Sequence, residues 1–138
     1  MSAVLAIGRV LFALIFINSG IGHLTKVEAM TGYATYKKVP APKLAVIVSG
    51  LMILIGGIYV ALGVYADLGS LLIAIFLIPT ALLIHNFWTE SDATAKMTAR
   101  TGFLKDIALA GAALMIFVFI GRGADIGWHI TSAFFSLK

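Results

Sequence analysis

The chain has 138 residues, of which 61% are hydrophobic and only 12% are charged. Soluble domains are about 45–50% apolar and about 25% charged, so the composition excludes an ordinary soluble domain and a disordered chain. The absence of cysteine excludes disulfides, iron–sulfur clusters and zinc-thiolate sites. In so apolar a chain, the net charge of +4 is interpreted as a signal of membrane topology, and nucleic acid is not expected as a partner.

Four hydrophobic stretches dominate the sequence. Each is close to the ~20 residues that a helix needs to cross the bilayer core, and none alternates with the period of a barrel strand. The first is predicted to be a membrane span and not a cleaved signal peptide, because Arg9 lies inside it and no basic residue precedes it. We therefore predict an all-α integral membrane protein, a single four-transmembrane-helix bundle over residues 1–138, with helices at residues 4–24, 44–66, 68–87 and 103–121.

The basic residues indicate how the bundle is oriented. Because cytoplasmic loops collect lysine and arginine, the two long loops are predicted to face the cytoplasm and both chain ends to face the other side. The first of these loops contains Pro40 and Pro42, which predict an extended entry into the second helix, and two tyrosines, and it is expected to be an interfacial loop. Seven of the ten basic residues lie in these loops: Lys26, Lys37, Lys38, Lys43, Lys96, Arg100 and Lys105.

The tail, residues 123–138, has apolar side chains at helical spacing. Ile126, Ile130 and Phe134 recur every four residues beside Trp128. This pattern predicts a short amphipathic helix that lies on the membrane surface.

Ionisable residues inside the spans are the main functional candidates, because a charged group is costly at depth in a bilayer. Arg9 and His23 share one face of the first helix. Asp67 and His85 are 18 residues apart, about five helical turns, and share a face of the third. If these helices adjoin, Arg9 meets Asp67 at one end and His23 meets His85 at the other. Alternatively, Arg9 snorkels to the interface or pairs with Asp125.

Three hypotheses account for the two histidines. In the first, each histidine caps a helix end or contacts a backbone carbonyl. In the second, both line a site for a quinone headgroup, with Trp88 as an aromatic wall and Lys105 nearby. In the third and weaker one, both ligate a haem. No further metal site is expected, since the remaining acidic residues lie mostly in loops. The pair Lys105-Asp106 is either an ordinary charge arrangement in a first helical turn or the completion of this polar cluster.

The arrangement of several motifs resembles the DoxX family of small four-helix membrane proteins, from about residue 5 to residue 121. The resemblance implies a protein of the bacterial inner membrane, related to the small membrane subunit of thiosulfate:quinone oxidoreductase. The motifs that carry it are Arg9, Gly20-Ile21-Gly22-His23, the loop with Pro40, Gly56-Gly57, His85-Asn86-Phe87-Trp88 and Lys105-Asp106 with Gly111.

Two classes of function follow. The first is a subunit of a quinone-linked redox system, in which His23, His85, Trp88 and Lys105 bind the quinone and a partner protein performs the remaining chemistry. The second is a non-enzymatic membrane anchor or assembly factor for a redox or stress-response complex, whose basic loops dock a soluble partner. Either class implies a protein partner or a homo-oligomer within the bilayer.

Overall fold

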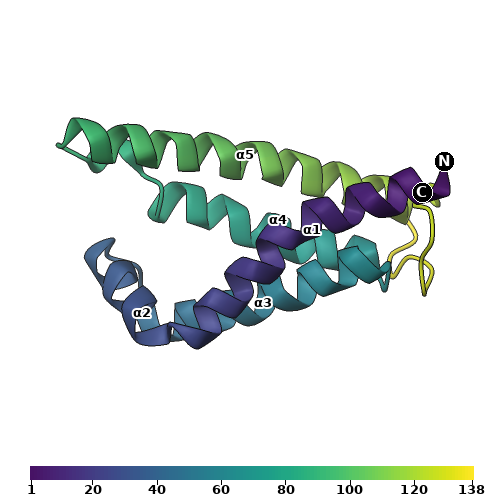
Figure 1. The fold of residues 1–138 in the computed structure, drawn as a ribbon, viewed down its shortest axis with the longest axis horizontal. Coiled ribbons are helices and arrows are strands. Elements are labelled where there is room, and N and C mark those ends of the chain that lie inside the picture. The colour runs from purple at the N-terminus through teal and green to yellow at the C-terminus, as the bar shows by residue number, and fades with distance from the viewer.

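The computed structural model describes residues 1–138 and is built from helices alone (Figure 1). This confirms the predicted all-α class, and four segments are long and apolar enough to cross a membrane: α1, α3, α4 together with η1, and α5. The elements in chain order are α1 (Ser2–Thr25), α2 (Val27–Tyr36), α3 (Pro42–Leu62), α4 (Ala66–Leu83), the 3-10 turn η1 (Phe87–Thr89) and α5 (Ala93–Gly121).

The long helices pack in a row, with α1 against α3, α3 against α4, and α4 against α5. Helix α1 has no comparable packing with α4 or α5. Figure 1 shows α1 and α3 diverging from α5 toward the end of the molecule that carries α2, while both chain termini lie at the opposite end. The backbones of α1 and α5 are therefore farther apart at the α2 end than at the end with the termini.

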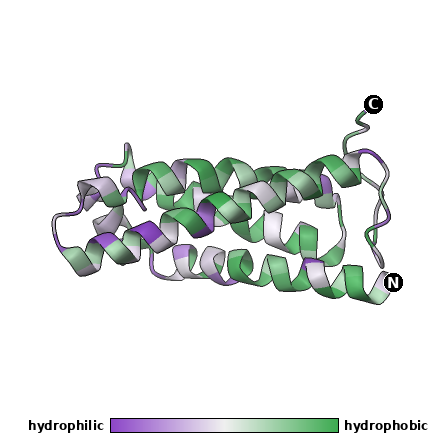
Figure 2. Cartoon of the chain, turned by 90° about the horizontal axis from the view of Figure 1, so that it is seen from above, coloured by the Kyte–Doolittle hydropathy of each residue, from purple (hydrophilic) through white to green (hydrophobic).

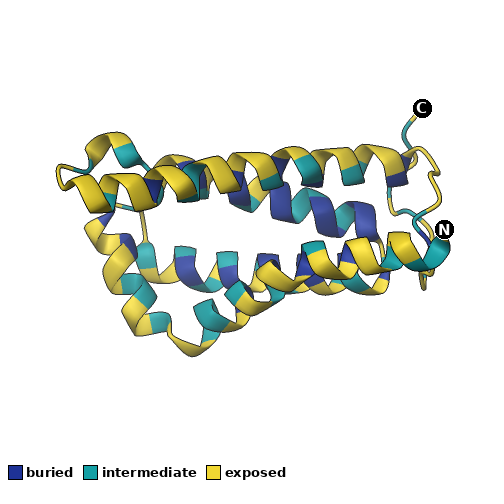
Figure 3. Ribbon diagram, turned by 45° about the horizontal axis from the view of Figure 1, so that its top comes forward, coloured by how far each residue is buried: buried dark blue, intermediate teal, exposed yellow.

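Small residues bring the helices together. A Cβ atom added at Gly56 of α3 would lie 2.8 Å from the carbonyl oxygen of Gly69 in α4, and one at Gly20 of α1 would lie 2.7 Å from the Cβ of Leu54. Such close approach replaces the hydrophobic effect as the source of helix association in lipid. Buried residues line the inward faces in Figure 3, and the apolar outward faces in Figure 2 match a lipid environment.

Two predicted helix boundaries were wrong. Helix α5 begins at Ala93, ten residues before the hydrophobic stretch, because Asp92 caps it by accepting a hydrogen bond from the Ala95 N–H at 2.8 Å. Helix α3 ends at Leu62, because Gly63 adopts a left-handed φ of 67°. In addition, the loop at residues 25–43 contains the ten-residue helix α2.

The predicted tail helix is also wrong, because the segment after Arg122 forms turns, bends and irregular chain. Gly123 and Gly127 have left-handed φ values of 82° and 76°, which interrupt any helix there. The tail instead folds back over the end of the bundle. The N–H groups of Ile130 and Thr131 donate to the Gly63 carbonyl at 3.0 and 3.1 Å.

Candidate functional site

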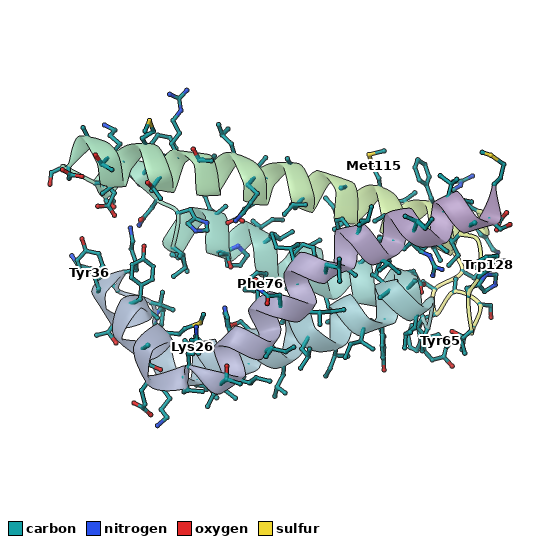
Figure 4. The ribbon with its side chains drawn as sticks, viewed as in Figure 1. Lys26, Tyr36, Tyr65, Phe76, Met115 and Trp128 are labelled. Carbon is teal, nitrogen blue, oxygen red and sulfur yellow. The ribbon has the colours of Figure 1, made fainter.

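A cavity of about 750 Å³ is lined by residues of α1, α2 and α3 on one side and of α4 and α5 on the other. Its volume falls in the range of small-molecule sites, about 300–1,000 Å³. Of its 26 lining residues, 17 are hydrophobic. Phe76 and Lys26 are two of the lining residues and are labelled in Figure 4. An apolar ligand with a few polar groups fits such a lining.

His23 reaches this cavity from the last turn of α1. Its Nδ1 lies 3.2 Å from the Val46 carbonyl oxygen and 3.1 Å from Ser49 Oγ, both on α3. The close approach requires Gly50, since a Cβ there would lie 2.6 Å from the Cβ of His23. The ring meets Phe76 edge-on, with centroids 6.0 Å apart. The contact with a backbone carbonyl matches one of the three hypotheses for this histidine.

His85 follows the end of α4 and lines the same cavity. A contact with an acidic side chain holds its ring in place. Its Nδ1 lies 2.6 Å from Oδ2 of Asp106, a carboxylate that is only 3% exposed. Gly102, one turn earlier on α5, seats the imidazole: a Cβ there would lie 2.8 Å from the ring. Of the two interpretations of Asp106, the structure therefore favours membership in the polar cluster.

Lys105 also lines the cavity and has no carboxylate within ion-pair distance. Trp88 does not line it. Its ring packs instead against Phe87 and Phe103, with centroids 5.3 and 5.8 Å apart. The structure thus brings together three of the four predicted site residues, and the aromatic wall comes from Phe16 and Phe76.

The predicted pair of Arg9 and Asp67 does not form. The Arg9 guanidinium, on a residue only 7% exposed, donates to the carbonyl oxygens of Val60 and Trp128. The buried Asp67 accepts the N–H groups of two tail residues, Phe134 at 2.9 Å and Phe135 at 2.6 Å. Helix α1 packs against α3 and not against α4, and each of the two charged groups instead binds backbone groups of the tail.

The alternative pair of Arg9 with Asp125 does not form either. Arg9 is buried within the chain, and snorkelling to the membrane interface stays a prediction. Asp125, the alternative partner, accepts the N–H of Gly127 within the tail at 2.9 Å. Arg9 is therefore a structural residue that holds the tail against the bundle.

A buried polar cluster beside the cavity escaped the sequence analysis. Lys37 Nζ at the end of α2 lies 2.5 Å from Glu90 Oε1 and 2.9 Å from Asn86 Oδ1. The lysine side chain is only 3% exposed, although its sequence position indicated a solvated loop. No spacing rule connects residues about 50 positions apart, so only the fold reveals this cluster.

The family model for DoxX matches residues 4–86. The chain belongs to the DoxX family. The matched segment covers α1 to α4 and includes both cavity histidines, whereas Lys105 and Asp106 lie beyond it. Membership confirms the resemblance and agrees with the four apolar spans of a multi-pass membrane protein. No curated protein and no solved structure matches this DoxX chain.

Proposed function

We propose that this DoxX protein is the membrane subunit of a quinone-linked redox system and binds the quinone ring between His23 and His85. The observation that carries the proposal is the apolar cavity lined by two histidines, each with a polar partner. A quinone has an apolar body with two polar oxygens, which suits this lining. Helices α1 and α5 do not pack against each other at the α2 end, and we place the quinone tail between them.

The residues of the cavity fit such a ligand. Phe16 and Phe76 supply apolar surface for the ring. Asp106 orients the imidazole of His85, while Val46 and Ser49 orient that of His23. Lys105 supplies a further donor and a positive charge. A bound quinone would supply the capacity to carry two electrons and two protons.

The remaining chemistry is assigned to a partner protein. The side chains of this protein orient and bind the quinone. The chain has no cysteine thiol, and its sequence shows no nucleotide-binding motif. We place the α2 end on the cytoplasmic side of a bacterial inner membrane, because most basic residues lie there. Lys38, Lys96 and Arg100 are exposed at this end and form the proposed docking surface.

Direct measurement of bound quinone tests the proposal. Wild type, His85→Ala and the control His129→Ala are purified in mild detergent, and quinone in solvent extracts is quantified from its ultraviolet spectrum before and after reduction. His129 lies in the tail at the opposite end, with Nδ1 2.7 Å from the Gly127 carbonyl. We expect quinone in extracts of wild type and of the control, and about tenfold weaker binding of the added reduced form, the quinol, by His85→Ala.

Two results would contradict this function. A Soret band that disappears in His85→Ala would instead support haem ligation. Spectra with only tryptophan and tyrosine absorption, together with no binding of added quinone, would favour the anchor or assembly factor.

A further inference from the structure

We infer that the cavity binds the reduced quinol form more tightly than the oxidised quinone, because its two histidines present hydrogen-bond acceptors. This inference rests on the proposed function and adds the redox state of the ligand. Its basis is the partner of each Nδ1 atom, which decides which ring nitrogen carries the hydrogen.

For His85 the partner is a carboxylate. Asp106 Oδ2 lies 2.6 Å from Nδ1, and an ionised carboxylate can only accept. Nδ1 must therefore carry the hydrogen. In the neutral ring, Nε2 is then left as an acceptor.

For His23 the partner is a backbone carbonyl, which also can only accept. The Val46 oxygen lies 3.2 Å from Nδ1. Ser49 Oγ, 3.1 Å from the same nitrogen, donates its own hydrogen to that carbonyl at 3.2 Å. Its lone pairs thus face the imidazole, so both neighbours require a hydrogen on Nδ1. His23 adopts the same tautomer as His85.

Both Nε2 atoms are available to a ligand. Neither has a hydrogen-bond partner within the chain, and neither is among the buried unpaired polar atoms, which are Arg9 Nε and Thr31 Oγ1. Both rings belong to residues that line the cavity. The site therefore offers two unpaired acceptors to its occupant.

Acceptors discriminate between the two redox forms, whereas donors do not. The hydroxyl groups of a quinol donate to Nε2, but the carbonyl oxygens of a quinone would face it lone pair to lone pair. The donors that line the cavity serve either form, because carbonyl and hydroxyl oxygens both accept; they are Ser19, Lys26, Tyr33 and Lys105. Thr80 is occupied, since its hydroxyl donates to the Phe76 carbonyl at 2.8 Å.

The test compares a short-chain quinol with its quinone, titrated anaerobically into the purified full chain at pH 8, where imidazole is ordinarily neutral. We expect the quinol to bind at least about tenfold more tightly, which raises the midpoint potential of the bound two-electron couple by about 30 mV. Equal affinities, or tighter binding of the quinone, would overturn this inference and leave the proposed function standing. Failure of both forms to bind would overturn the proposed function itself.

Asp106→Asn tests Asp106 as a positioning residue. When the amide NH2 group faces Nδ1, the ring hydrogen moves to Nε2 and turns that atom into a donor. The preference for quinol should then fall or reverse in this variant and persist in the control Asp125→Asn. An unchanged preference in an Asp106→Asn protein whose ¹⁵N shifts place the His85 hydrogen on Nε2 would overturn the assignment.

A second measurement does not depend on the folding of any variant. Nitrogen chemical shifts of ¹⁵N-histidine in the wild-type protein at pH 8 report the tautomers directly. We expect His23 and His85 both to carry hydrogen on Nδ1. Hydrogen on Nε2 of both rings would overturn the inference.

Discussion

Lys37 Nζ lies 2.5 Å from Oε1 of Glu90, and the two side chains are only 3% and 14% exposed. The pair joins the end of α2 to the segment that follows η1, and Asn86 completes it at 2.9 Å from the amine. Asn86 is the residue after His85. The cluster therefore fixes the short helix α2 against the segment that holds one of the cavity histidines.

Removal of this lysine should destabilise the protein. In Lys37→Ala the Glu90 carboxylate stays largely buried without its partner, and breaking such a pair costs about 3 kcal/mol. Denaturant unfolding in detergent measures the change. The control Lys43→Ala breaks the ion pair with Glu28, whose side chains are 61% and 83% exposed, and should cost less than about 1 kcal/mol. Equal losses of unfolding free energy in the two variants would contradict the expectation that the buried pair stabilises the protein more than the exposed pair.

The position of the His85 ring against Gly102 can be tested by adding a methyl group at that glycine. In Gly102→Ala the new Cβ lies within 2.8 Å of the imidazole in its present position, so the ring must move away from Asp106. We expect quinol affinity to fall about tenfold while the helix content by circular dichroism stays unchanged. The matched control is Gly111→Ala on the same helix, where a Cβ meets nothing within 4 Å. Unaltered affinity in Gly102→Ala would argue against this ring position.

The packing of α3 against α4 should be sensitive to a larger side chain at Gly56. A methyl group there would lie 2.8 Å from the Gly69 carbonyl, which is backbone and cannot rotate aside. Gly56→Ala must separate α3 from α4, and such overpacking costs about 1–3 kcal/mol. Thermal unfolding in detergent should show a lower midpoint. Gly8→Ala, where a Cβ has open space, should leave the midpoint the same or higher.

The tail should detach when Asp67 is removed. This carboxylate accepts the N–H groups of Phe134 and Phe135, and hydrogen bonds to a charged group contribute about 1.5–3 kcal/mol each. Asp67→Ala should therefore speed the release of C-terminal residues by carboxypeptidase at least about tenfold. Asp125→Ala, which loses only a bond to Gly127 within the tail, serves as the control. Equal digestion rates would show that other contacts hold the tail.

By itself, the sequence determined the class of the molecule. Its apolar composition requires a bilayer, and a chain in lipid must satisfy its backbone within helices, so four spans follow directly. The sequence also placed His23 and His85 at one end of the bundle, because the first and third spans cross in the same direction. Family membership is carried largely by these spans, within residues 4–86.

Only the tertiary structure decided which polar groups meet. The spans are apolar on nearly every side, so hydrophobic periodicity says little about how each helix is rotated or which helix is its neighbour. The partnership of His85 with Asp106 and that of Lys37 with Glu90 depend on that rotation. The tail binds Arg9 and Asp67 because its two glycines turn it back over the end of the bundle. There a tail carbonyl oxygen accepts from Arg9, and tail N–H groups donate to Asp67.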